Sequence, residues 1–95
     1  MASKERTGSR QAIEVRVELK RGILDPEAEA VRKALDLLGI KGLESVAMSR
    51  SYTLEFSHAD PQEARRRAEA SVERLLANPI IHRVSIHAVA SGARR

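Results

Sequence analysis

Histidine is the residue type that most readily binds metals or transfers protons near neutral pH. The sequence contains three histidines, His58, His82 and His87, and no two of them have the spacing of metal ligands on one helix or hairpin. His82 and His87 are five positions apart in an expected strand, so their side chains should point to opposite faces of a sheet. We therefore expect surface or interface histidines and no metal centre.

Acidic side chains are numerous but are not arranged for acid–base catalysis. Most of the thirteen aspartates and glutamates lie along predicted helix faces and strand exteriors, and Glu69 and Glu73 have arginines around them. No acid pair has the apolar setting that general acid–base catalysis uses. The sequence also lacks cysteine, a G-x-S-x-G elbow, a Walker loop and a G-x-G-x-x-G loop. These features argue against a self-contained enzyme.

Basic residues could contact nucleic acid, but their excess lies at the two ends of the chain. The net charge of the 95 residues is +4; residues 1–10 and 91–95 carry five basic residues and one acidic residue, and residues 11–90 carry twelve of each. We expect both tails to be disordered and residues 11–90 to form one small domain. A nucleic-acid-binding module that works through the tails is the alternative function.

Two motifs inside the domain are better explained by local structure than by nucleic-acid binding. Arg65-Arg66-Arg67 spreads around a predicted helix with glutamates nearby, which favours a solvated helix face. Gly39-Ile40-Lys41-Gly42 matches the G-x-x-G of KH domains but joins a helix to a strand, so we interpret it as a helix end and a turn. No apolar segment reaches the ~20 residues of a membrane span, and residues 1–10 lack a secretory signal, so we expect a cytoplasmic protein.

The first half of the domain predicts a strand and a helix. Residues 13–19 alternate apolar and charged side chains, which is the two-residue period of a strand with one buried face. Asp25-Pro26 has the residue types of a helix N-cap and first helical position, and Gly39 is suited to the helix end. The predicted buried stripe of this helix comprises Ala28, Val31, Leu35 and Leu38.

The second half predicts a hairpin, a helix and a last strand. We expect strands at 43–48 and 52–57, joined by a tight turn at Ser49-Arg50-Ser51. The core-facing residues of the second of these strands should be Tyr52, Leu54 and Phe56. Asp60-Pro61 should begin a helix that Asn78-Pro79 ends, and residues 80–89 should form the fourth strand. The buried side of that helix should comprise Ala64, Ala68, Val72, Leu75 and Leu76.

The element order β-α-β-β-α-β is typical of an α+β, ferredoxin-like fold, in which two helices cover one face of a four-stranded antiparallel sheet. Both sheet edges and the other sheet face would be uncovered in a monomer. A chain of this length buries little core, which favours oligomers. From the residues alone we infer either an interaction domain or a regulatory domain. The regulatory domain would be a ligand-sensing domain of the ferredoxin-like type.

Two sequence segments resemble a known family. Gly22-Ile23-Leu24-Asp25-Pro26 and Leu75-Leu76-Ala77-Asn78-Pro79-Ile80-Ile81 resemble signatures of the PurS family, the small subunit of phosphoribosylformylglycinamidine synthase, over about residues 13–89. The chain departs from the family at Ser49 and Arg50, which replace a Gly and a Lys. A second departure is His82-Arg83-Val84, where the family often has two acidic residues and an aromatic residue.

The resemblance implies a non-catalytic structural subunit in de novo purine biosynthesis. Such a subunit would bridge the PurQ-type glutaminase and the PurL-type synthetase of a glutamine- and ATP-dependent carbon–nitrogen ligase, so that ammonia passes between them. The resemblance implies a homodimer or higher homo-oligomer. The residues themselves predict no membrane partner and argue only weakly for a nucleic-acid partner. ATP, Mg and glutamine would be used by the partner subunits, and this chain would bind no cofactor or metal and carry no catalytic residue.

The same resemblance selects the segments that would contact other subunits. They are the stretch before the first helix, the predicted turn before Tyr52, and the stretch after the second helix. The candidate interface residues are Gly22, Asp25, Pro26, Ser49, Arg50, Tyr52, Asn78, Pro79, Ile80 and Ile81. Helix capping alone would also explain Asp25-Pro26 and Asn78-Pro79.

Overall fold

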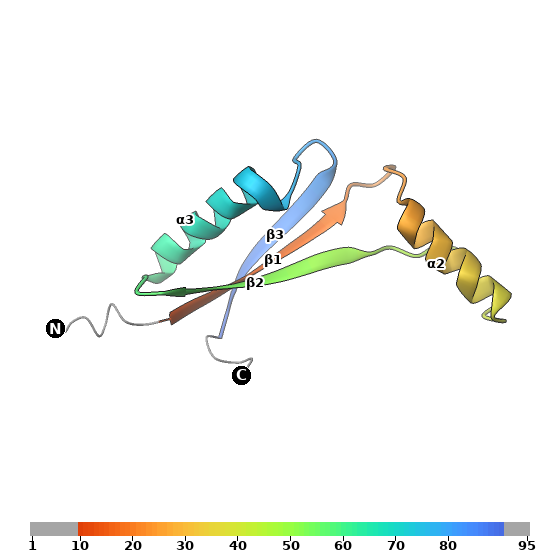
Figure 1. The fold of residues 1–95 in the computed structure, drawn as a ribbon, viewed down its shortest axis with the longest axis horizontal. Helices are drawn as coiled ribbons and strands as arrows, with labels where there is room; N and C mark the ends of the chain where they lie inside the picture. The colour runs from red at the N-terminus through yellow and green to blue at the C-terminus, as the bar shows by residue number, and fades with distance from the viewer. Residues whose placement is uncertain (1–9, 91–95) are drawn as a thin grey trace.

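A computed structural model describes residues 10–90, and the predicted tails fall outside the described residues except for Arg10, the first residue of a strand. Residues 10–90 form three strands and two α-helices, the second of which continues into a π-helical turn (Figure 1). These elements are β1 (Arg10–Leu19), α2 (Pro26–Leu37), β2 (Ser49–Ser57), α3 (Pro61–Ser71), the π-turn η1 (Val72–Leu76) and β3 (His82–Val89).

The sheet has three antiparallel strands in the order β2-β1-β3, so the predicted four-stranded sheet is wrong. Residues 43–48 form no strand, and the predicted turn Ser49-Arg50-Ser51 belongs to β2, where Val17 pairs with Arg50. The physical reason lies in β1. Its pairing with β2 ends at Glu18–Ser49, and the chain then turns away at Gly22, whose φ is +84°. Residues 43–48 therefore have no neighbouring strand with which to pair.

The core lies between α3 and one face of the sheet. Val15 is fully buried there, and Ile13 and Val17 are nearly so, as the alternation of residues 13–19 predicts. Ala64 and Ala68 are also fully buried, because small side chains let α3 approach the sheet closely. Helix α3 packs mainly on β1 and β3. The predicted core residues of β2 are half-buried and pack against this cluster; they are Tyr52, Leu54 and Phe56.

Both predicted helix starts are confirmed. The Asp60 carboxylate accepts a hydrogen bond from the Glu63 amide (2.8 Å), and Asp25 caps α2 in the same way. The end of the second helix differs from the prediction, because α3 gives way to η1, whose wider turn breaks the 3.6-residue period. Leu75, predicted to lie in the core, is 83% exposed, whereas Leu76 packs against the core.

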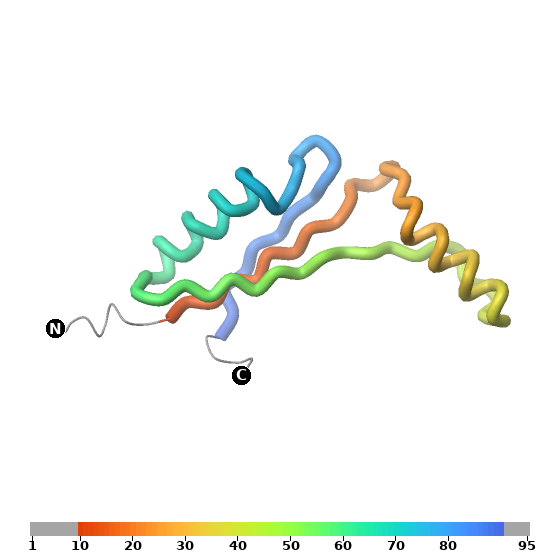
Figure 2. Tube along the Cα trace, viewed as in Figure 1, coloured from red at the N-terminus to blue at the C-terminus, as the bar shows by residue number. Residues whose placement is uncertain are grey.

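Helix α2 does not lie on the sheet, which contradicts the prediction of two helices on one face. It projects from the end of the sheet, and residues 23–48, called the arm below, form the far part of the molecule (Figures 1 and 2). The radius of gyration is 18.0 Å, compared with about 12 Å for a compact chain of this length. Of the predicted buried stripe only Ala28 is buried, while Val31 and Leu38 are 39% and 77% exposed.

Candidate interaction site at the base of the arm

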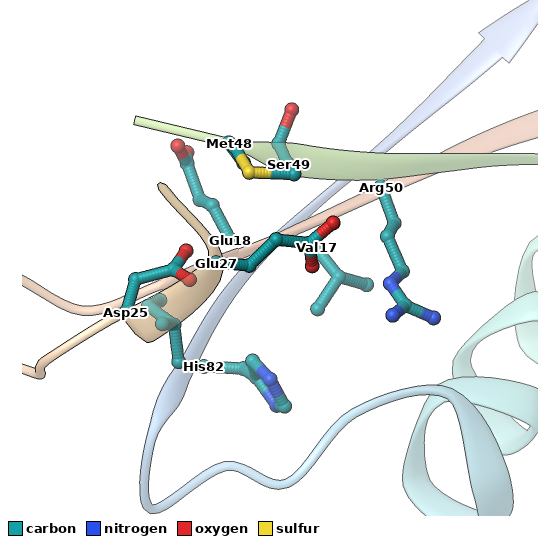
Figure 3. A pocket seen from close by; sticks show the side chains of 9 residues that line it. Val17, Glu18, Asp25, Glu27, Met48, Ser49, Arg50 and His82 are labelled. Carbon is teal, nitrogen blue, oxygen red and sulfur yellow. The ribbon is translucent and has the colours of Figure 1, made fainter. Parts of the chain in front are cut away.

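Segments that are far apart in the sequence meet where the arm joins the sheet. The amide of Lys20 donates to the carbonyl of Ile81 (2.9 Å), which holds the end of β1 next to the loop before β3. A depression of about 200 Å³ opens beside this contact (Figure 3). Its lining residues come from β1, the arm, β2 and β3, and they are Val17, Glu18, Leu19, Asp25, Glu27, Met48, Ser49, Arg50 and His82.

Strand register sets the two sides of the depression. Arg50 is opposite Val17 in the β1–β2 ladder, and His82 is opposite Leu19 in the β1–β3 ladder. His87 is opposite Glu14, an even-numbered residue of β1, so the two strand histidines lie on opposite faces as predicted. Figure 3 shows Glu27 extending from the arm into the space between Asp25 and Arg50.

The loop before β3 is ordered by its own polar groups. The Asn78 amide donates to His82 Nδ1 (2.8 Å), and the Asn78 side-chain oxygen accepts from the Ile80 amide (2.9 Å). The Asn78 carbonyl also accepts from the amides of Ile81 and His82. This network explains Asn78 as a loop-forming residue and leaves the Ile80 side chain 78% exposed at the surface.

The charges of the depression differ in how they are used. Asp25 accepts from the Ala28 amide (3.1 Å) as a helix cap, and Glu18 pairs with Arg83 (3.3 Å). Glu27 and Arg50 make no ion pair within residues 10–90. No cluster of three potential metal ligands occurs in the described part of the chain. Within the described residues, the carboxylate of Glu27 and the guanidinium of Arg50 are thus without an ion-pair partner, which suits the docking of a polar partner surface.

A second ion pair lies on the outer part of the arm. The Arg32 guanidinium donates to the Glu29 carboxylate, with a shortest distance of 2.6 Å. This hydrogen bond lowers the pKa of Glu29 below its ordinary value and raises that of Arg32. Both groups are open to solvent, so we expect this ion pair to fix the positions of the two side chains but to contribute little to the stability of the fold.

The structure brings together some of the predicted interface residues and not others. Asp25, Ser49 and Arg50 line the depression, and Ile81 is bonded at its edge. Gly22 forms the turn before the arm, and Pro26 is the exposed first residue of α2. Pro79 lines a neighbouring hollow with His82 and Val84. Tyr52 lies apart from the depression, opposite Val15, and packs against the core.

Sequence reasoning did not select several residues of the depression. Val17, Glu18 and Met48 fall in predicted strands, and Glu27 falls in the first predicted helix. These residues come together only through the pairing register of the strands, and that register cannot be predicted from a short stretch of sequence. His82 did stand out in the sequence, as a departure from the family pattern.

The arginine run on α3 behaves as a solvated helix face. Arg65 pairs with Glu69 (3.1 Å), and Arg67 pairs with Glu63 (2.6 Å), both at a spacing of four residues. Arg65 also donates to the carbonyl of Ile86 (3.3 Å) on β3. Two of the three guanidinium groups of this run, those of Arg65 and Arg67, are therefore engaged in contacts within the protein.

Comparisons with known proteins agree on one family. Residues 12–90 match the family model PurS, described as phosphoribosylformylglycinamidine (FGAM) synthase. The chain is 41% identical over 73 residues to the phosphoribosylformylglycinamidine synthase subunit PurS of Archaeoglobus fulgidus, covering 77% of this chain and 91% of the relative.

Solved structures show the same fold. The structure of Methanocaldococcus jannaschii PurS, a subunit of formylglycinamide ribonucleotide amidotransferase in the purine biosynthetic pathway, has a TM-score of 0.71 and 26% identity, covering 83% of this chain and 95% of that one. A chain in the structure of PurLQS from Thermotoga maritima has a TM-score of 0.74 over 85% of this chain and 99% of its own length, and at 17% identity it supports the fold alone. Within residues 10–90, no helix has the length and apolar character needed to cross a bilayer.

Proposed function

This chain belongs to the PurS family, whose members are the PurS subunit of FGAM synthase in purine biosynthesis. We propose that this chain is a non-catalytic structural subunit of the FGAM synthase complex. It would bridge the PurQ-type glutaminase and the PurL-type synthetase, so that ammonia from glutamine reaches the synthetase without passing through bulk water. ATP, Mg and glutamine would be bound by those partners in the cytoplasm, and this chain would carry none of them.

The observation that supports an assembly role is the apolar surface that a single copy leaves in water. Leu24 and Leu38 on the arm are each more than three-quarters exposed, and so are Leu75 in η1 and Ile80 in the loop before β3. Apolar side chains grouped in this way mark interaction surfaces, because exposing them to water is unfavourable. We therefore assign contacts to both regions, including contacts between copies of this chain in a homodimer or higher homo-oligomer.

The base of the arm is the surface we assign to a partner subunit. Arg50 and Glu27 lie there with no ion pair in the described part of the chain. Ile80 is exposed in the loop before β3, two residues before His82, which lines the depression. Charged groups at an interface favour correct docking more than they raise affinity. We propose that the candidate residues around this depression orient the complex: Asp25, Ser49, Arg50, Pro79 and Ile80.

Reconstitution tests this function. Purified synthetase and glutaminase should form FGAM from glutamine at a high rate only when this chain is present, because the bridge delivers the ammonia. The same synthetase supplied with ammonium salt should need this chain much less. Equal glutamine-dependent rates with and without the chain would refute the bridging function.

A charge-reversal variant then tests the site. Arg50→Glu should reduce glutamine-dependent synthesis, since it replaces the free guanidinium of the depression. Arg66→Glu, on the exposed side of α3, is the matched control and should have little effect. Circular dichroism of both variants would show that each remains folded.

A further inference from the structure

A hollow of about 320 Å³ lies between the end of the α3–η1 helix and the start of β3. Binding pockets measure about 300–1,000 Å³, so a hollow of this size suits a single side chain better than a cofactor. The π-turn η1 borders it, and π-helical turns occur frequently at functional sites. The walls are largely apolar, and the residues that form them are Val72, Ala77, Pro79 and Val84.

Two carboxylates lie at the hollow. Glu69 and Glu73 both line it, and because they are four positions apart they are neighbours on one side of the helix, where like charges repel. Arg65 pairs with Glu69 (3.1 Å), but Glu73 makes no ion pair within residues 10–90. A cation at the hollow would therefore relieve this repulsion and supply Glu73 with a partner.

The helix separates its charges between two sides. On the β2 side, the surface between the helix and the sheet is lined by Arg67 and Arg74 and, among the described residues, by no acidic side chain. On the β3 side, the hollow is lined by Glu69 and Glu73 and, in residues 10–90, by no lysine or arginine. The β3 side therefore selects a positively charged partner group, whereas the β2 side repels one.

His82 connects the hollow to the base of the arm, because it lines both the hollow and the depression there. Its Nδ1 accepts a hydrogen bond from the Asn78 amide (2.8 Å), so the ring is neutral, with its hydrogen on Nε2. In this state the imidazole does not compete with an incoming cation for the carboxylates. A partner subunit that docks at the depression is thus directly next to the hollow.

We propose that a partner subunit docked at the base of the arm inserts a lysine or arginine side chain into this hollow. Its methylene stem lies against Pro79 and Val84, and its charged end pairs with Glu73. An apolar side chain would leave the Glu73 carboxylate desolvated without a partner, and an acidic one would be repelled. The inference rests on the partner subunits of the proposed function and states the chemistry that one of them presents.

Three variants test the charge and the space of the hollow separately. Glu73→Gln removes the charge and keeps the size of the side chain, whereas Ala77→Leu fills the hollow from its own wall. Glu63→Gln is the matched control, because it is the same change at the other end of α3. The ion pair of Glu63 with Arg67 is partly exposed, so its loss should matter little. Circular dichroism and urea melts would show that each variant folds.

Isothermal titration calorimetry would measure the binding of each variant to the separate synthetase and glutaminase, at roughly 50 and 300 mM salt. We expect Glu73→Gln to raise the dissociation constant about tenfold for one of the two partners, because the basic side chain loses its counter-charge. The affinity of this variant should also depend less on salt than that of the natural chain. Ala77→Leu should weaken binding to the same partner, and Glu63→Gln should change neither dissociation constant.

Three results would overturn the inference: natural affinity of Glu73→Gln for both partners, equal weakening by Glu73→Gln and Glu63→Gln, and natural affinity of a folded Ala77→Leu. Light scattering of the chain alone adds a fourth, because a mass that changes in Glu73→Gln while both affinities stay natural would assign the hollow to a second copy. Reconstituted glutamine-dependent synthesis is measured separately. If that synthesis needs the natural chain and Glu73→Gln binds normally, the inference about the hollow fails while the bridging function stands.

Discussion

Leu38 and Leu37 form a matched pair for testing which side of α2 is buried in the assembly. Leu38 belongs to the apolar stripe and is 77% exposed in one copy, whereas Leu37 lies on the opposite side of the helix and is 86% exposed. Leu38→Gln and Leu37→Gln both leave helix propensity nearly unchanged. Because both side chains contact water in a single copy, neither change should alter the stability of a monomer by more than about 0.5 kcal/mol.

The expected effect on the dimer follows from the exposed fraction. Complete burial of a leucine side chain is worth about 1.5–3 kcal/mol, so burying the exposed 77% of Leu38 is worth about 1–2.5 kcal/mol for each arm. A symmetric dimer loses this twice, for a total of about 2–5 kcal/mol. Leu38→Gln should therefore raise the dimer dissociation constant by roughly 30- to 3,000-fold.

Sedimentation equilibrium over a range of concentrations measures both dissociation constants directly. We expect the Leu37→Gln variant to have the same dimer dissociation constant as the natural chain. We expect the Leu38→Gln variant to be largely monomeric at micromolar concentration. Equal weakening by the two changes would show that the helix is buried on all sides or in another orientation. A Leu38→Gln dimer as tight as the natural one would show that the stripe stays in water, and the reasoning from exposure would be wrong.

Three further predictions concern the single chain. Asp60→Ala removes the hydrogen-bond acceptor at the start of α3 and should lower the unfolding free energy by about 1 kcal/mol in urea melts. Asp60→Asn should retain most of the stability that the cap provides. Equal losses of stability in the two variants would exclude a capping role. Ala68→Leu should cost about 1–3 kcal/mol because Ala68 is fully buried, and an unchanged urea midpoint would contradict the packing of α3 on the sheet. In an NMR titration the pKa of Glu29 should lie below its ordinary value and rise in Arg32→Gln, because the hydrogen bond from Arg32 is lost. A carboxyl group whose pKa is lowered by folding stabilises the folded state at pH values above its unfolded-state pKa. The small contribution of Glu29 to stability should therefore fade as the pH falls through its lowered pKa. If Arg32→Gln leaves the pKa of Glu29 unchanged, the ion pair does not form in solution.

Features set by neighbouring residues could be predicted from the sequence. The alternation in residues 13–19 identified β1 and its buried face, and Asp25-Pro26 and Asp60-Pro61 identified both helix starts. Gly39 has the positive φ of +95° expected where a helix ends. Each of these depends on interactions within a few residues, so the necessary information lies in a short stretch of sequence.

Features set by distant residues could not be predicted in the same way. Residues 43–48 look like a strand, but whether they pair depends on where β1 turns away, some twenty residues earlier in the chain. The base of the arm was predicted in pieces, as Asp25, Ser49 and Arg50, without the register that gathers them. The stripe of α2 correctly predicted an amphipathic helix, but no sequence pattern specifies which surface an amphipathic helix will cover.

The charge balance of the chain gains a structural meaning from the arm. Residues 11–90 are neutral as a whole, yet the arm has a net charge of −2, so the remaining residues of that range have a net charge of +2. A neutral domain whose charge is separated in this way attracts a second copy when the arm of one meets the body of the other, and repels it when the two arms meet. In the proposed homo-oligomer, electrostatics therefore favours contact between the arm of one copy and the body of another over contact between two arms. Because the charged groups are largely exposed, added salt should weaken this preference while leaving the apolar contribution in place.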